Sequence, residues 1–355
     1  EEFYPIVKAV VERSHDAEKP VYIHATELET ARKSVEAGCD VLVHNIVDKE
    51  VDEDFLKLCK ENDVIIIPTM WVFDSYESVY SKQLDLLPSE HWLGNPQVIG
   101  SLFDMYELDY DELGDRQKKL IVEKKPIKQD TLLMKNLKKI WDYGITVAAG
   151  TDAGNVGVIH GPSLFHEFMY MAEAGLTPHQ ILKSATLNGA KLLGNESKLG
   201  SIESGKLADL VVLNSNPLDD ILNTSDVFAV MRNGGGLIYP DTLLARTPED
   251  LAQIQLNAYN EHDIESFLQA YADDVEVYMF PDSLRYKGKE KMREVYSAFF
   301  KKTPELHCRL VSRMTKGDFA IDREFVTGIP GRENLNAIAV YEIKNGIIEK
   351  VWFIP

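Results

Sequence analysis

Cysteine is scarce in this sequence. The three cysteines, Cys39, Cys59 and Cys308, are widely spaced and odd in number among 355 residues. They therefore make neither a paired disulfide framework nor a cysteine-based zinc site. Because disulfides are typical of oxidising compartments, this scarcity fits a cytoplasmic protein. Export is the alternative, because the chain starts at Glu1 without a methionine and its first residues read like the middle of a domain.

Long apolar runs and excess positive charge are also lacking. The sequence has no run of about 18 apolar residues that would suggest a membrane span. The formal net charge is −19, and so acidic a chain is repelled by nucleic acids and by anionic membranes. We therefore expect neither as a partner. The chain is nevertheless 45% hydrophobic and 355 residues long, which favours about two domains with cores of their own.

Short apolar segments alternate with helical patterns in the first part of the chain. The predicted strands are 19–25, 39–45 and 63–69, and residues 145–154 are predicted to form a fourth strand and the turn after it. The predicted helices are 27–38, 51–62 and 132–144, and a partly helical insertion spans 70–131. Strands that are apolar throughout, separated by amphipathic helices, indicate βα units with a parallel sheet covered on both faces. Four such units amount to half of a (β/α)₈ barrel.

Polar side chains stand where three of these strands end. His24 and His44 close the first two, and Asp152 follows the fourth in the motif GTDAG. A lone histidine at a strand end is more often structural than a ligand. Three equivalent positions are harder to explain by packing, because each buried unpaired group costs about 1–3 kcal/mol. Two imidazoles and a carboxylate suit a divalent metal that keeps a position open for water.

These motifs, together with 160–194 and 198–221, resemble the second half of the amidohydrolase superfamily barrel over about residues 1–245. The branch they resemble is the imidazolonepropionase-like and Xaa-Pro dipeptidase-like group. The resemblance implies hydrolysis of amide, peptide or cyclic amide C–N bonds in a small molecule or short peptide. It also implies one or two divalent ions, zinc above all, held by His24, His44 and Asp152, with Asp152 as the general base.

Part of the family's pattern has no counterpart in this sequence. The His-x-His pair of the first barrel strand is missing, as is the bridging carboxylated lysine or glutamate of the fourth. We expect these remaining ligands upstream of residue 1, on a longer polypeptide. The alternatives are that another chain supplies the other half of the barrel, or that the barrel has degenerated.

Three further histidines and one glutamate are weaker candidates. His160 either faces the substrate or stabilises its own loop. Glu167, beside His166 on the following helix, is a substrate-contact candidate by resemblance, although a solvated helix face is the favoured interpretation. His179 lies in the first turn of a helix that Thr177 caps in a capping-box pattern, so its role is structural.

The last part of the chain reads as a separate α+β domain. We predict the first domain over 1–196 as strands five to eight of a barrel, a return segment to a small β-sandwich over 197–246, and an α+β domain over 247–355. In the last of these, helices precede four strand-like runs in a meandering antiparallel sheet. The pattern resembles the nuclear transport factor 2-like cone, especially its SnoaL-like members. Five polar residues are candidates to enter the cone: Tyr278, Asp282, His307, Asp322 and Glu324.

Three functions therefore compete. The leading one is a metal-dependent amidohydrolase with an accessory ligand-binding or dimerisation domain. The second is a non-catalytic binding or scaffold protein with a vestigial barrel. The third places an isomerase or cyclase activity in the cone domain. Both resemblances imply a homo-oligomer.

Overall fold

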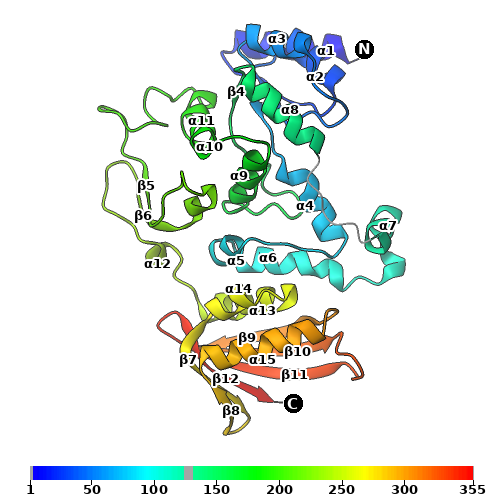
Figure 1. The fold of residues 1–355 in the computed structure, drawn as a ribbon, viewed down its shortest axis with the longest axis vertical. Helices are drawn as coiled ribbons and strands as arrows, with labels where there is room; N and C mark the ends of the chain where they lie inside the picture. Colours follow the sequence, from blue (N-terminus) through cyan, green and yellow to red (C-terminus); the bar gives the residue numbers. More distant parts are fainter. Residues whose placement is uncertain (1–2, 124–130, 355) are drawn as a thin grey trace. The chain divides into compact units, whose positions relative to one another are not determined.

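The computed structural model describes residues 3–123 and 131–354, so the last part of the predicted insertion, 124–130, lies outside the described residues. Contacts divide the chain into two compact units (Figure 1). The first unit comprises 1–76 and 125–240, and the second comprises 77–124 and 241–355. Within the described residues, no helix is both long and apolar enough to cross a membrane.

The first unit is built on a parallel sheet, and all four predicted strands are present. They are β1 (Tyr22–His24), β2 (Val41–Val43), β3 (Ile65–Ile67) and β4 (Thr146–Val147), paired in the order β1-β2-β3-β4. The strands are shorter than predicted. The backbone turns out of strand geometry just beyond β2, β3 and β4, at His44, Thr69 and Asp152, where φ is positive. Two of these turns, at His44 and Asp152, therefore fall at predicted site residues.

Helices cover this sheet. They are α1 (Tyr4–Asp16), α2 (Leu28–Glu36), α3 (Glu53–Glu61), α8 (Thr131–Asp142), α9 (Ser163–Glu173), α10 (Pro178–Ala185) and α11 (Leu187–Leu192). One hydrophobic core joins the strands to the helices, including Leu42, Phe55 and Ile140. The predicted cap of α10 is confirmed, because Thr177 accepts from Gln180 N and the Gln180 side chain accepts from Thr177 N. This capping-box arrangement fixes where α10 begins.

The segment predicted to return to a small β-sandwich forms a separate two-stranded sheet. Its antiparallel strands are β5 (Leu210–Leu213) and β6 (Val227–Met231), linked through the 3₁₀ helix η3 (Ile221–Ser225). Beyond β6 the chain turns back, and Val230 and Ile238 exchange two backbone hydrogen bonds of 2.8 Å. The short helix α12 (Pro240–Leu243) follows.

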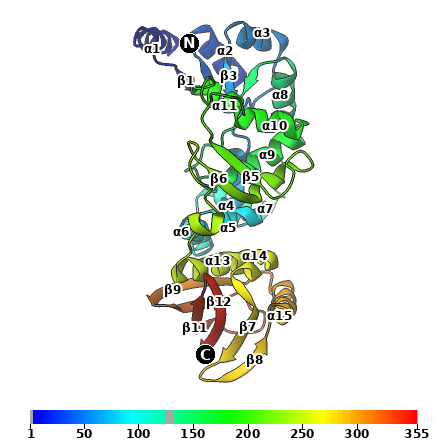
Figure 2. The same cartoon turned by 90° about the vertical axis from the view of Figure 1, so that its left-hand side faces the viewer.

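The second unit contains an α+β domain with a six-stranded mixed sheet (Figure 2). Its helices are α13 (Pro248–Glu261), α14 (Ile264–Gln269) and α15 (Lys289–Lys302). Its strands are β7 (Tyr271–Met279), β8 (Ser283–Lys287), β9 (His307–Lys316), β10 (Phe319–Thr327), β11 (Leu335–Lys344) and β12 (Ile347–Ile354). The strand order is β8-β7-β12-β11-β10-β9.

The predicted antiparallel meander of four strands is confirmed, although the complete sheet is mixed. Strands β9 to β12 do form an antiparallel meander, but β12 then pairs in parallel with β7. Strand β8 was not predicted. Its sequence SLRYK alternates polar and apolar residues over only five positions, and four of the five residues are exposed. Long-range pairing between the first and last strands of a domain leaves no local signal in the sequence.

Most of the predicted insertion packs in the second unit. Its elements are α4 (Trp71–Tyr80), α5 (Pro88–Leu93), α6 (Pro96–Leu102), η1 (Phe103–Tyr106), η2 (Tyr110–Glu112) and α7 (Asp115–Glu123). Asn257 on α13 donates to Pro96 O at 2.8 Å, and His91 Nε2 on α5 lies 2.6 Å from Glu261 Oε2. A Cβ atom on Gly100 would stand 2.6 Å from Gln253 Nε2, so glycine permits α6 to approach α13 this closely.

Candidate functional site

The structure brings the predicted site residues of the first unit together. The rings of His24 and His44 meet edge to face with centroids 4.3 Å apart. His44 Nε2 lies 3.9 Å from Asp152 Oδ2. His24 is the last residue of β1, His44 directly follows β2, and Asp152 lies just beyond β4. The three side chains therefore share the carboxyl edge of the sheet, where βα folds place their active sites.

His44 is the most constrained of the three. Its side chain is 7% exposed, against 41% for Asp152. Its Nδ1 is hydrogen-bonded to Thr69 Oγ1 at 2.6 Å, which leaves Nε2 directed at Asp152. Burial lowers the pKa of His44, and the neighbouring His24 lowers it further while Asp152 opposes the shift. A neutral imidazole with one nitrogen anchored and the other free is the form that binds metals.

Backbone geometry puts these residues in place. His44, Thr69 and Asp152 have φ values of 79°, 43° and 57°, a left-handed conformation that non-glycine residues adopt at a cost and often at functional sites. Gly150 of the GTDAG motif allows close backbone packing next to the turn at Asp152. A Cβ atom on Gly150 would lie 2.6 Å from Ile67 Cγ2, so glycine allows the end of β4 to lie tightly against β3.

A network of side chains holds the loop after Asp152 against the start of α4. Tyr76 OH donates to Asn155 Oδ1 at 2.5 Å, and Ser75 Oγ donates to Val156 O at 2.9 Å. His160, the predicted substrate-contact residue, is exposed beside this loop. A Cβ atom on Gly154 would lie 3.4 Å from its Cε1. His160 thus borders the loop that carries Asp152, and its role in substrate binding stays a prediction.

The prediction that His166 and Glu167 lie on a solvated helix face is wrong. Both are buried, with exposed fractions of 3% and 0%. The ring of His166 stacks on Trp71 at 3.9 Å, and Glu167 Oε2 accepts from Trp71 N at 3.0 Å. Burial raises the pKa of Glu167 to about 7. The signal was present in the sequence, because α9, SLFHEFMYMAE, is apolar on nearly every side, as buried helices are.

The donor set fits a divalent metal only in part. The 3.9 Å between His44 Nε2 and Asp152 Oδ2 is a span that two ligands of one zinc ion, each at about 2.0–2.2 Å, can bridge. Among residues 3–123 and 131–354, however, no cluster of three or more His, Cys, Asp or Glu side chains is arranged to hold a metal. His44 and Asp152 are therefore spaced to share a cation, and the ring of His24 lies beside that of His44.

The five polar candidates of the α+β domain divide into two groups. Asp322 and Glu324 are buried, and His307 nearly so. Asp322 accepts two hydrogen bonds from Arg313, of 2.7 and 2.6 Å, in a bidentate pair. By contrast, Asp282 is exposed, and Tyr278 OH donates to Glu276 within its own strand.

Glu324 borders a cavity of about 250 Å³ between the helices and the sheet of the second unit. The walls are largely aromatic: Tyr259, Tyr271, Tyr296, Phe299 and Tyr341. Tyr341 OH donates to Glu324 Oε1 at 3.2 Å. Burial raises the pKa of Glu324 to about 8, and nearby Asp322 adds to the shift. The carboxyl is therefore protonated at neutral pH and is available as a hydrogen-bond donor.

Comparison with known proteins gives a match to each part of the chain. Residues 133–235 match the amidohydrolase family, and residues 253–351 match the SnoaL-like domain. Imidazolonepropionase of Thermoplasma acidophilum is 33% identical over 104 residues, which are 29% of this chain and 25% of that protein. Ochratoxinase of Aspergillus niger is 24% identical over 216 residues, 61% of this chain and 36% of that protein.

Solved structures resemble each part as well. A Xaa-Pro dipeptidase with bound methionine is 28% identical, with a TM-score of 0.48 over 66% of this chain and 48% of that one. A cystatin-fold protein from Novosphingobium aromaticivorans is 24% identical, with a TM-score of 0.30 over 31% of this chain and 99% of that one. The chain spans well under half of the length of the curated relatives that it matches. The chain thus carries a match to the amidohydrolase family at residues 133–235, followed by a match to the SnoaL-like domain at residues 253–351.

Proposed function

We propose that this protein hydrolyses amide, peptide or cyclic amide C–N bonds with the help of a divalent metal, zinc above all. The observation that carries the proposal is the contact of His44 with both His24 and Asp152 at one edge of a parallel sheet. The family match over 133–235 includes Asp152. Relatives named imidazolonepropionase and ochratoxinase supply the reaction class by analogy.

We further propose that the four-stranded sheet is strands five to eight of a (β/α)₈ barrel. The parallel order β1-β2-β3-β4 supports this assignment, since the outer strands β1 and β4 each keep one edge unpaired among the described residues. Open edges of parallel strands are normally covered by further strands or by other structure. In this proposal the ligands that the described residues do not supply belong to the remaining strands.

The residues of the site have distinct roles in the proposed reaction. A divalent cation bound there lowers the pKa of water from 15.7 to about 7, so that hydroxide is available near neutral pH. His44 would hold the cation through Nε2, with its ring oriented by Thr69, and His24 would supply a second nitrogen. Asp152 accepts the proton of the attacking water and donates it to the leaving nitrogen, as a general base and then acid. Its 41% exposure leaves room for substrate.

Metal removal tests the proposal. The protein is offered a panel of N-acyl amino acids, Xaa-Pro dipeptides and cyclic amides, and amine release is measured before and after treatment with a chelator. We expect hydrolysis of at least one class, loss of that activity on chelation, and recovery when zinc is restored. Hydrolysis that withstands complete metal removal would refute the metal-dependent mechanism. Zinc-loaded protein that hydrolyses none of the panel would refute the assigned substrate class.

A second candidate function belongs to the cavity at Glu324. A protonated carboxyl among aromatic side chains can donate a hydrogen bond to a ligand carbonyl, so the cavity is suited to a small aromatic or alicyclic ketone. Such a site could bind the ketone or isomerise it. The buried state of Glu324 and its pKa of about 8 favour this candidate.

The candidate predicts a pH dependence of a definite sign. Glu324 donates while protonated, so ketone affinity is full well below pH 8 and falls as the pH rises through this value. At pH 9.5 only about 3% of the carboxyl stays protonated, which weakens binding about 30-fold. The probe is 2-acetylnaphthalene, followed by fluorescence from pH 6.5 to 9.5. Glu324→Gln keeps a donor and should bind equally at every pH. A wild-type affinity independent of pH would contradict the role of Glu324.

A further inference from the structure

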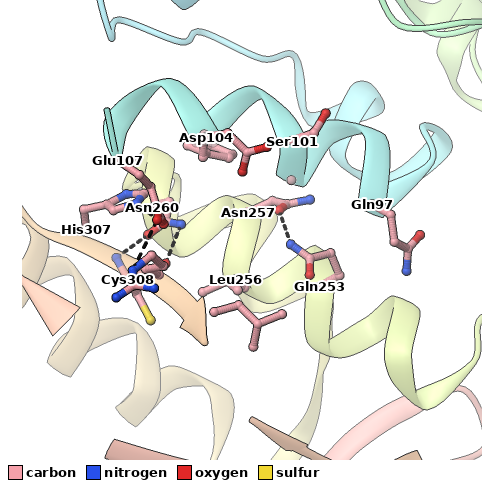
Figure 3. A pocket seen from close by; sticks show the side chains of 14 residues that line it. Gln97, Ser101, Asp104, Glu107, Gln253, Leu256, Asn257, Asn260, His307 and Cys308 are labelled. Carbon is pink, nitrogen blue, oxygen red and sulfur yellow. Dashed lines mark hydrogen bonds and ion pairs between the residues drawn. The ribbon is translucent and has the colours of Figure 1, made fainter. Parts of the chain in front are cut away.

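A second cavity of the α+β unit is separate from the one at Glu324. It encloses about 310 Å³ between α6 and η1 on one side and α13 and β9 on the other (Figure 3). All of its walls belong to the second unit. Unlike the aromatic cavity, it is lined largely by polar side chains, which include Asp104, Glu107, Asn257, His307 and Arg309.

Much of this polar wall is engaged within the protein. Gln253 Nε2 donates to Asn257 Oδ1 at 2.7 Å, and Asn257 Nδ2 donates to Pro96 O at 2.8 Å. Asn260 pairs with both backbone polar groups of Cys308, donating to its oxygen at 3.0 Å and accepting from its nitrogen at 2.8 Å. These bonds, drawn in part in Figure 3, tie α13 to α6 and to β9. Because these polar groups already bond to the protein, we expect a ligand to be recognised by the side chains at the end of the cavity around His307.

His307 has hydrogen-bonding capacity that the described residues do not use. Its side chain is 13% exposed, and neither ring nitrogen has a hydrogen-bond partner among the described residues. The ring stacks on Tyr106 with centroids 5.3 Å apart and planes 15° apart. Burial, together with the nearby cations Lys82 and Arg309, lowers the pKa of His307 to about 4. At neutral pH the ring is uncharged and offers one N–H donor and one lone pair. Buried groups of this kind are normally paired.

The charged side chains around His307, and its distance from Glu107, indicate which kind of ligand could bind to the ring. Glu107 Oε2 lies 3.2 Å from Arg309 Nε, and Asp104 and Lys82 add one charge of each sign nearby. The balance of two carboxylates and two cations disfavours a charged ligand. Glu107 Oε1 stands 3.8 Å from His307 Nε2, which is too long for a hydrogen bond. A hydroxyl between them can donate to the carboxylate and also pair with the imidazole, because it is both donor and acceptor.

We propose that this cavity binds a small uncharged polyol, a sugar or cyclitol, through hydroxyls placed between Glu107 and His307. The volume of about 310 Å³ equals that of about ten water molecules and accommodates one six-membered ring. The site is independent of the proposed hydrolase chemistry, since none of its residues belongs to the first unit.

The test is an NMR titration of the ¹⁵N-labelled protein with myo-inositol and with D-glucose. We expect saturable shifts of the backbone amides at 257–260 and 307–310. His307→Phe keeps the stacked ring and loses both nitrogens. Glu107→Gln keeps the shape but removes the negative charge and replaces one of the two acceptor oxygens by an NH₂ donor. Each should weaken the dissociation constant by about tenfold or more, the effect of losing one or two hydrogen bonds. Glu294→Gln removes one exposed carboxylate of an ion pair with Lys291 and should leave binding unchanged.

Three small control probes of different charge complete the experiment: neutral acetamide, anionic acetate and cationic putrescine. The proposal is overturned if neither polyol gives a saturable shift up to the highest soluble concentration, or if only a probe that is not a polyol does so. It is also overturned if both cavity variants bind the polyols as the wild type does. Glu107→Gln changes a single charged group at a partly exposed position, so we expect it to fold. It therefore still tests the proposal if His307→Phe does not fold.

Discussion

Replacing Asp152 by asparagine is expected to lower kcat for amide hydrolysis by about 10²–10⁴-fold, the usual contribution of a general acid–base group. Asparagine keeps the size of the side chain and tolerates the left-handed backbone that Asp152 adopts, at φ 57°, better than most residues. The amide cannot accept the proton of the attacking water. The rate is measured at saturating zinc, with the substrate that the protein hydrolyses fastest, so that weaker metal binding does not mask the effect on turnover.

Asp63 offers a matched control for this experiment. It precedes β3, at the opposite edge of the sheet, and has a similar left-handed backbone, with φ 51°. Asp63→Asn therefore makes the same chemical change in the same conformation without touching the site. If Asp152→Asn and Asp63→Asn had equal kcat values, Asp152 would not be the general base.

Replacing His44 by asparagine is expected to weaken zinc binding by more than about 100-fold, because the loss of a ligand exceeds the 10–100-fold cost of losing an outer partner. Asparagine again suits the left-handed backbone, φ 79°. Zinc affinity is measured by competition with a chromophoric chelator. His179→Asn changes an exposed histidine in the first turn of α10 and should leave the affinity unaltered.

The variant Thr69→Val tests the orientation of the His44 ring separately from the binding of the metal by His44. The variant keeps the β-branched shape and removes only the hydroxyl that bonds His44 Nδ1 at 2.6 Å. We expect a loss in zinc affinity of about 10–100-fold, smaller than that of His44→Asn. If His44→Asn and the wild type bound zinc equally, His44 would not be a ligand.

The parts of the fold that could be predicted from the sequence are those that short stretches of sequence determine. Four apolar segments bounded by turn residues gave the parallel strands, and the left-handed turns at His44 and Asp152 then placed their side chains at one sheet edge. Parallel strands align their carboxyl ends whatever their separation in sequence, so residues as distant as His44 and Asp152 could be expected to meet. The capping box at Thr177 was predictable for the same reason, because all its atoms lie within one turn.

The features that the sequence did not reveal depend on partners far along the chain. The periodicity of the segment after β3 identifies apolar faces but not what covers them, and α6 lies against α13 through Asn257 and Pro96. The parallel pairing of β12 with β7 likewise joins the two ends of a domain. The ring of His307 gave no sign of its unpaired nitrogens, because these follow from the burial created by that packing.

The most direct test of the central claim, that His24, His44 and Asp152 share one cation, is anomalous diffraction from zinc-soaked crystals of this protein. We expect an anomalous peak within about 2.0–2.2 Å of both His44 Nε2 and Asp152 Oδ2, with a nitrogen of His24 as a further ligand. An intact fold with no zinc peak at these atoms, or with zinc bound only elsewhere, would contradict it.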